Sequence, residues 1–228
     1  TGVQTCALPI SLNEEDPAFV GLYREARARA AELGQKSGLP EEVVQQVLAG
    51  VHEPGRFADL VAGYLDINPG HVPAMVLLAE IYKERHDWLK ASRVLEAASD
   101  YATNHIEKTN LSAEAAFINF EELEDENKAV QLFTKTLGFD PEHAKVGKVL
   151  AGILYERQDF SGADPIFDML TRKVEVLALE PDEQRDLYLR AAKTARALGN
   201  ADKALKQYKR AYDIDSTNHE VLSGMADL

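Results

Sequence analysis

The feature that most constrains this chain is an alanine that recurs in step with a large residue four positions later. The pairs are Ala91 with Leu95, Ala129 with Phe133, Ala163 with Phe167, and Ala204 with Tyr208. Residues four apart lie on the same face of an α-helix. The pattern predicts that two helices cross closely at each alanine, and that the large residue fills the groove one turn later.

The clearest copy of this pattern is the segment 185–218. Two amphipathic runs flank the turn Leu198-Gly199-Asn200, and each has one apolar face with the spacing of a helix. A 34-residue helix–turn–helix with small residues at the helix contact is the repeat of tetratricopeptide proteins, which this chain resembles. The resemblance implies an all-α, right-handed superhelical solenoid of antiparallel helix pairs, preceded here by a short helical segment.

Four such repeats are predicted within 72–228, and we name the two helices of each repeat helix A and helix B. The repeats are 72–105, 110–143, 144–177 and 185–218, followed by a helix at 219–228 that stops within the pattern. Successive alanines are 38, 34 and 41 residues apart, so two connections carry extra residues. These are expected in loops near 106–109 and 178–184, where insertion is tolerated. We also expect the native array to continue beyond Leu228.

The first ten residues, TGVQTCALPI, carry no charge and contain the only cysteine, Cys6. They resemble the translation of a sequencing adapter, so residues 1–10 are expected to be a non-native scar. Residues 11–69 are predicted to form a helical N-terminal segment. Its three helical runs lie at about 19–33, 40–50 and 56–65, with a turn at His52-Glu53-Pro54-Gly55 before the third run.

Within that segment, LPEEVVQQVLAGVHEPGRFADLVAGYLD resembles the helical segment that ends the substrate-recognition region of Lon proteases. The resemblance implies a regulatory or substrate-recognition piece of an ATP-dependent protease. No GxxxxGK[ST] phosphate loop and no assignable Ser–Lys pair occur in the sequence. The same residues are also compatible with convergence of short helices, with a chimeric assembly, or with a decayed second helix of an earlier repeat at 56–69.

Composition and motifs narrow the function classes. The net charge of −13 argues against nucleic acid as a partner, and no apolar run reaches the ~20 residues that span a bilayer. No GxSxG or HExxH motif occurs, and the six histidines are expected to be loop or helix-capping residues. The acidic cluster at 121–126 is expected to be a solvated helix end. We therefore expect no enzyme activity, no metal and no cofactor, and a cytoplasmic protein by default.

The tetratricopeptide resemblance implies that a ligand binds in a concave groove lined by helix A. Carried onto this sequence, the groove positions are Glu80, Lys83, Glu84, Glu114, Ile118, Glu121, Glu122, Lys145, Lys148, Tyr155, Glu156, Leu189, Arg190, Lys193 and Arg196. The Lys/Asn clamp that grips chaperone tails is not reproduced, because Gly152 and Ile118 stand where an asparagine is needed. The resemblance therefore implies a different peptide or protein ligand.

Charge differs between the repeats. Repeat 110–143 has eight acidic and two basic residues, a net charge of −6, whereas repeat 185–218 has four acidic and eight basic residues, a net charge of +4. A groove that is acidic at one end and basic at the other would orient a peptide or allow self-association of arrays end to end. The alternative is that these are solvated faces. The leading hypothesis is an interaction scaffold in which Lys148, Arg190, Lys193 and Arg196 meet an acidic ligand. The alternatives are a Lon-like fragment and one arm of a larger enzyme or sensor.

Overall fold

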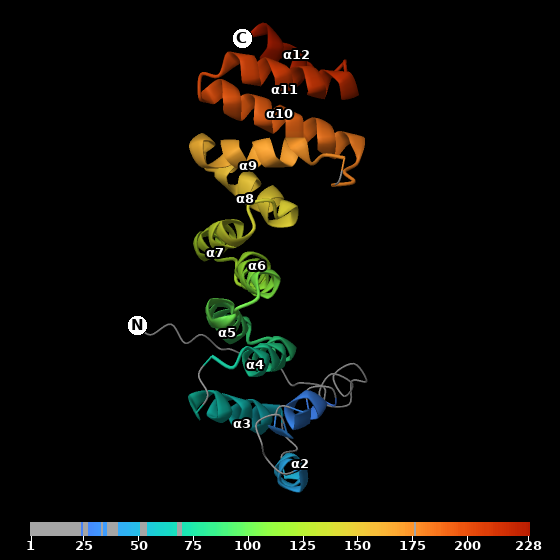
Figure 1. Cartoon of the computed structure of the whole chain (residues 1–228). Helices are drawn as coiled ribbons and strands as arrows, with labels where there is room; N and C mark the ends of the chain where they lie inside the picture. Colours follow the sequence, from blue (N-terminus) through green and yellow to red (C-terminus); the bar gives the residue numbers. More distant parts are fainter. Residues whose placement is uncertain are drawn as a thin grey trace, which may run out of the picture. The chain divides into compact units, whose positions relative to one another are not determined.

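A computed structural model describes residues 24, 27–32, 34–35, 41–50, 54–67, 70–175 and 177–228. The predicted adapter segment and the start of the first helical run lie outside these residues. The chain divides into two compact units, 1–125 and 126–228, and each is described by itself. The described part contains helices and turns but no strand, which confirms the predicted all-α class (Figure 1).

The first unit contains α2 (Glu41–Ala49), α3 (Pro54–Ile67), α4 (Val72–Glu84), α5 (Trp88–Tyr101) and α6 (His105–Glu121). The second contains α7 (Glu126–Phe139), α8 (Ala144–Glu156), α9 (Phe160–Arg172), α10 (Pro181–Ala197), α11 (Ala201–Ile214) and α12 (His219–Ala226). From α3 to α6, and from α7 to α12, each helix packs against the next along the chain. Partners joined by three-residue turns, such as α8 and α9, must run antiparallel to lie against each other.

The recurring alanines lie where the sequence pattern places them. All four are completely buried, and the large residues one turn later are at most 2% exposed. In the second unit, Ala163 and Phe167 share a hydrophobic cluster with Ala151 of α8 and Ala191 of α10. Ala204 and Tyr208 lie in a second cluster with residues of α10 and α12. Helix B therefore contacts helix A of its own repeat and helix A of the next.

Three of the four turns inside repeats, at 85–87, 157–159 and 198–200, have one recurring conformation. The second residue of each has a left-handed backbone, with φ of 53° at His86, 58° at Gln158 and 75° at Gly199. The next residue starts helix B: the side chain of Asp87, Asp159 or Asn200 accepts a hydrogen bond from the backbone N–H three residues on. This combination of a left-handed C′ residue and an N-cap ends one helix and begins the other within three residues.

The extra residues between repeats are mostly helical, so the prediction of loops at 106–109 and 178–184 was wrong. Helices α6 and α10 have 17 residues, whereas α4 and α8 have 13, so each longer helix A gains about one turn at its start. Capping explains the change. The side chain of Asn104 accepts hydrogen bonds from Ile106 N and Glu107 N, and α10 begins with Pro181 at a position that needs no donor. Of the predicted loop 178–184, only residues 178–180 lie outside α10.

Two histidines cap helices, as the sequence predicted. His71 Nδ1 accepts a hydrogen bond from Ala74 N at 3.2 Å at the start of α4, and His143 Nδ1 accepts one from Val146 N at 3.3 Å at the start of α8. Asn218 does the same for α12 through Val221 N at 3.1 Å. The loops before α4, α6, α8 and α12 therefore use histidine or asparagine for one task, which is to satisfy a free N–H group of the following helix A.

The N-terminal helices share a core with the first repeat. Phe57 and Val61 of α3, and Val44 of α2, lie in one hydrophobic cluster with Leu77 and Leu78 of α4. Helix α3 begins at Pro54, so Pro54 and Gly55 belong to its first turn and not to a preceding turn as predicted. Proline is well tolerated at the first helical position. The packing of α3 on α4 is that expected of a helix B before the next helix A, and it favours the interpretation of 56–69 as part of a decayed repeat.

Replacing Ala204 by leucine should lower the free energy of unfolding by about 1–3 kcal/mol, because the added atoms overpack a closed helix contact. Urea denaturation followed by circular dichroism measures the change. The matched control is Ala197→Leu, at an exposed position near the end of α10, where the change should stay within about 0.5 kcal/mol. Equal effects of the two substitutions would contradict a close crossing at Ala204.

Replacing His143 by alanine should cost about 1 kcal/mol of stability, because Val146 N loses its acceptor. His143→Asn should retain most of this stability, because Asn218 accepts the equivalent hydrogen bond at the start of α12. His105→Ala is the control, because His105 is exposed and lies inside α6 rather than at its cap. Thermal unfolding of the three variants checks the order; a His143→Asn variant as unstable as His143→Ala would count against a cap.

Candidate functional site

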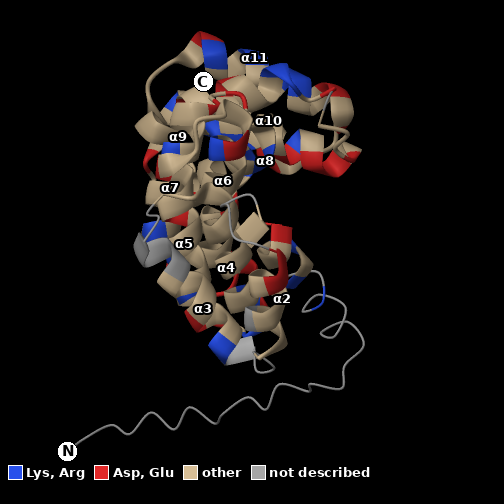
Figure 2. Ribbon diagram, turned by 60° about the horizontal axis from the view of Figure 1, so that its bottom comes forward, with Lys and Arg blue, Asp and Glu red and all other residues tan. Residues whose placement is uncertain are grey.

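Ion pairs join consecutive A helices of the second unit. Lys148 of α8 meets Glu183 of α10 at 2.8 Å, and Arg190 of α10 meets Glu156 of α8 at 3.6 Å. Toward α12, Lys193 meets Glu220 at 2.8 Å and Arg196 meets Asp227 at 3.4 Å. All four basic residues predicted to meet an acidic ligand are therefore engaged by carboxylates of this chain. The face is mixed in charge rather than basic, and Figure 2 shows both signs on α10.

In the first unit, Lys83 of α4 lies between two carboxylates. Its Nζ atom is 2.9 Å from Glu80 Oε1 and 2.5 Å from Glu114 Oε1 of α6. Burial favours the neutral amine, but the hydrogen bonds to Glu114 and Glu80 outweigh it and raise the pKa of Lys83. Glu84 is half-buried and Glu121 is exposed on the same two helices. Around Lys83, the predicted groove residues of α4 and α6 therefore include more carboxylates than lysines.

Two of the predicted groove residues are in the core. Ile118 is 7% exposed and Leu189 is 6% exposed, and Leu189 packs in the cluster of Ala192, Tyr208 and Val221. The sequence placed both on the ligand face because the family positions were counted along an ideal helix. Ile118 lines neither hollow described below, whereas Leu189, although buried, contributes to the wall of the smaller one. Of the others in the second unit, Lys145, Lys148, Arg190 and Arg196 are exposed, and Tyr155 and Lys193 are half-buried.

The predicted residues of α8 and α10 border two hollows in the second unit. The larger has a volume of about 250 Å³ and is lined by Lys148, Gly152, Phe167, Leu170, Leu177, Leu179, Glu183, Asp186, Leu187 and Arg190. The smaller has about 230 Å³ and is lined by Tyr155, Asp186, Leu189, Arg190, Lys193 and Glu220. They share Asp186 and Arg190, which lie one turn apart on α10. The two hollows therefore adjoin along this helix.

The larger hollow has an apolar floor that sequence reasoning missed. Phe167 and Leu170 of α9 are almost fully buried at its base, and Leu177, Leu179 and Leu187 are partly buried around it. Leu177 and Leu179 come from the connection before α10, and Glu183 comes from the extra turn of that helix. The signal in the sequence was the seven-residue excess between the last two alanines, together with its two leucines.

Tyr155 holds Arg190 in place. The guanidinium lies 5.4 Å from the centre of the Tyr155 ring, a cation–π distance. That ring in turn makes edge contacts with Phe160 and Phe167, at centroid distances of 6.0 and 6.2 Å. Two aromatic residues of α9 thus support a tyrosine of α8, which supports an arginine of α10. Arg190 is the cation best positioned at the border of the two hollows.

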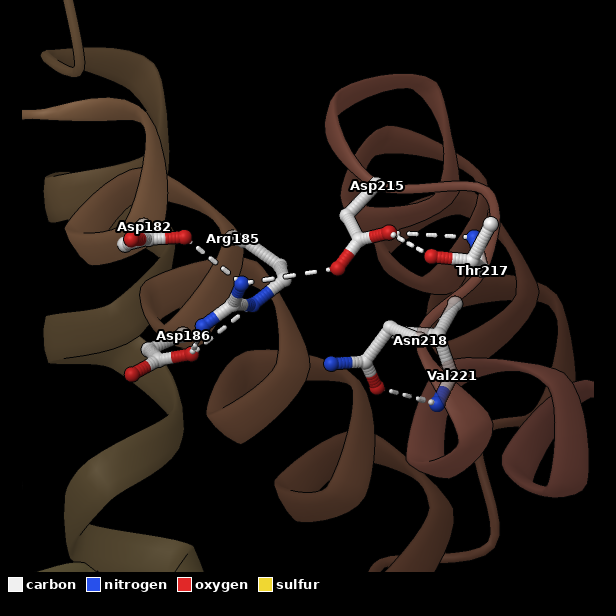
Figure 3. A network of polar contacts seen from close by, with 7 residues as sticks. All are labelled: Asp182, Arg185, Asp186, Asp215, Thr217, Asn218 and Val221. Atoms are coloured by element: carbon white, nitrogen blue, oxygen red, sulfur yellow. Dashed lines mark hydrogen bonds and ion pairs between the residues drawn. The ribbon is translucent and has the colours of Figure 1, made fainter.

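A polar network fixes the start of α10 against the loop before α12 (Figure 3). The Arg185 guanidinium pairs with Asp182 at 2.7 Å, Asp186 at 2.9 Å and Asp215 at 3.5 Å. Hydrogen bonds from the Thr217 hydroxyl and backbone N–H lower the pKa of Asp215. Asp186 therefore faces Arg185 as well as the hollows, so its charge is already balanced within the chain.

The described part of the chain offers neither a metal centre nor a membrane span. No group of three or more His, Cys, Asp or Glu residues there is placed to hold a metal ion. Over the same residues, no helix is both long enough and apolar enough to cross a membrane. The arrangement offers two hollows, an apolar floor and charged edges, which are features of ligand-binding sites.

Sequence comparison with known proteins finds one local likeness. No protein-family model matches the chain. Lon protease 1 of Sorangium cellulosum (strain So ce56) is 41% identical over 54 residues, which are 24% of this chain and 7% of that protein. The chain thus spans a small part of the length of this curated relative, and the Lon resemblance is confirmed as a local one.

Several solved structures are similar to this chain over most of its length. YrrB, a TPR protein with an unusual peptide-binding site, has a TM-score of 0.49 at 17% identity, over 89% of this chain and 98% of its own. PilF of Pseudomonas aeruginosa has a TM-score of 0.41 at 15% identity, over 91% and 100%. MamA of AMB-1 has 0.44 at 16% identity, over 86% and 99%.

The Lys148–Glu183 pair should make a pH-dependent contribution to stability. The hydrogen bond from Lys148, then the Glu180 backbone N–H, lowers the pKa of Glu183 below its ordinary value. The contribution is therefore complete above the pKa of unfolded glutamate, about 4.3, and is lost as the pH falls through the lowered folded value. A double-mutant cycle of Glu183→Gln and Lys148→Gln in urea should give a coupling at pH 7 that is smaller at pH 3. An unchanged coupling would contradict the pair.

Proposed function

We propose that this chain is an interaction scaffold that binds a peptide segment along the A helices of the second unit. The observation that carries the proposal is the pair of adjoining hollows bordered by α8, α10 and α12, with Asp186 and Arg190 common to both. An extended segment spans about 3.3 Å per residue, so a few residues suffice to reach from one hollow to the other.

The size and lining of the hollows favour a peptide over a small cofactor. Sites for drug-sized ligands usually have about 300–1,000 Å³, and each hollow here is smaller. Each can take a side chain, while the polar edges satisfy the peptide backbone between them. The charged edges are paired within the chain, so they contribute orientation more than affinity.

This proposal differs from the one drawn from the sequence. The sequence predicted a free basic face that attracts an acidic ligand, but Lys148, Lys193 and Arg196 each have a carboxylate partner at 3.4 Å or less. Affinity is therefore expected from the hollows and from the charged groups at their border, and not from a free basic face. Cytoplasmic location and self-association of arrays stay predictions.

Selection of random dodecapeptides on the full chain, followed by fluorescence anisotropy of the enriched peptides, tests the proposal. The double variant Arg190→Glu/Lys193→Glu should weaken binding at least tenfold, because it reverses charge at the border of both hollows. The matched control is Lys206→Glu/Lys209→Glu, at two exposed lysines of α11 that line neither hollow, and it should change affinity less than twofold. Failure to enrich any peptide, or equal losses in both variants, would contradict the proposal.

A second candidate function rests on the local likeness to Lon protease 1. In that case α2 and α3 belong to a segment that recognises unfolded protein. The exposed Val43 and Leu60 are the apolar side chains available for this purpose. Val43→Ser/Leu60→Ser should then abolish binding of a permanently unfolded casein probe while leaving the dodecapeptides bound. Loss of both kinds of binding, or of neither, would argue against a separate recognition segment.

A further inference from the structure

Part of the wall of the larger hollow comes from residues between α9 and the repeat that starts at 185. Leu177 is the last residue of the predicted repeat 144–177, Leu179 belongs to the connection before α10, and Glu183 to the extra turn of α10. Without these three residues, the hollow would lose two of its apolar side chains and the partner of Lys148. The shape of the hollow therefore depends on this region as well as on the helices of the repeats.

The backbone of the connection is held in a defined conformation. Leu177 N donates to Lys173 O at 3.0 Å, and Gln184 Nε2 donates to Leu179 O at 2.8 Å. Ala178, between the two leucines, has a φ of 46°, a left-handed conformation that a residue with a Cβ atom adopts at a cost. The hydrogen bonds on either side maintain this conformation, and the two flanking leucines both line the hollow.

The charged side chains at the edge of the larger hollow differ in the distance to their ion-pair partners. Lys148 is 2.8 Å from Glu183, and Asp186 is 2.9 Å from Arg185. Arg190 is 3.6 Å from Glu156, too far for a normal hydrogen bond, and the Glu156 side chain is 69% exposed. Its guanidinium is positioned by the Tyr155 ring instead. Arg190 can therefore accept a new carboxylate by displacing a weakly bound one, which costs little at an exposed site.

We propose that the larger hollow is a subsite for one large apolar side chain of a bound peptide, and that Arg190 pairs with a carboxylate within two residues of it. The inference rests on the proposed peptide-binding function and specifies its ligand class. The apolar floor of Phe167, Leu170 and the inserted leucines favours leucine, methionine or phenylalanine. Arginine favours a carboxylate, because two of its N–H groups can donate to it in parallel.

Gly152 allows a direct test of the hollow. This residue of α8 lines the hollow, and a Cβ atom added there would meet only Arg190 Nη1, at 3.8 Å. Gly152→Met should therefore fit the fold, raise the urea midpoint through better helix propensity, and place its side chain in the hollow. Affinity for the selected dodecapeptides should fall at least tenfold. Since the variant is expected to be more stable than the parent, the loss cannot be ascribed to unfolding.

The matched control is Gly138→Met. Gly138 is exposed in α7, a Cβ atom there meets nothing within 4 Å, and it lines neither hollow. This variant should gain stability in the same way and bind the dodecapeptides as the parent does. Comparable losses of affinity at positions 152 and 138 would overturn the assignment of the hollow.

The carboxylate is tested by changing both partners. Enriched peptides should carry Asp or Glu within two positions of a large apolar residue. Replacing that acid by its amide should weaken binding to the parent at least fivefold. The same replacement should change binding to Arg190→Gln less than twofold, because this variant lacks the guanidinium that pairs with the acid. Arg196→Gln, on the same helix but lining neither hollow, should retain the full preference for the acid.

The outcomes separate the two proposals. If Arg190→Glu/Lys193→Glu abolishes peptide binding while Gly152→Met leaves it intact, the apolar subsite is wrong and the peptide-binding face stands. If acid and amide peptides bind the parent equally, the role of Arg190 is wrong. If no dodecapeptide binds the parent, or the double variant binds as the parent does, the proposed function itself fails.

Discussion

The structure depends on the close crossing of two helices at a buried alanine. A small residue there lets the backbones approach, and the large residue one turn later reaches the next helix A. The next helix must then offer a small residue in return. Gly224 of α12 does so for Tyr208, because a Cβ atom there would lie 2.4 Å from the ring.

This packing sets where charge can act. Adjacent A helices bring side chains 27 to 35 residues apart into ion pairs, as with Lys193 and Glu220 or Lys148 and Glu183. Each exposed pair contributes at most about 1 kcal/mol, so the pairs do not hold the array together. Their effect is to balance positive and negative charge on the surface formed by the A helices. A chain with a net charge of −13 thereby presents neither a basic nor an acidic binding surface on the A helices of its second unit.

Sequence reasoning recovered the helix pairs but only part of the site. Lys148, Tyr155, Arg190 and Lys193 do line the hollows, because helix periodicity fixes which face they share. Ile118 lies in the core and lines neither hollow, since a shift of a fraction of a turn moves a side chain from groove to core, and the buried Leu189 contributes only to the wall of the smaller hollow. The leucines of the insertion were passed over because a connection has no periodicity from which to infer a face.

The sequence by itself determined the class of fold, the positions of the buried alanines and the capping role of His71 and His143. These follow from interactions between residues a few positions apart, which leave a periodic record in the chain. The tertiary structure alone decided that the extra residues lengthen α6 and α10, that Leu177 and Leu179 close a hollow over Phe167, and that Arg190 rests on Tyr155. Such outcomes depend on contacts between residues far apart in sequence, and no local pattern encodes those contacts.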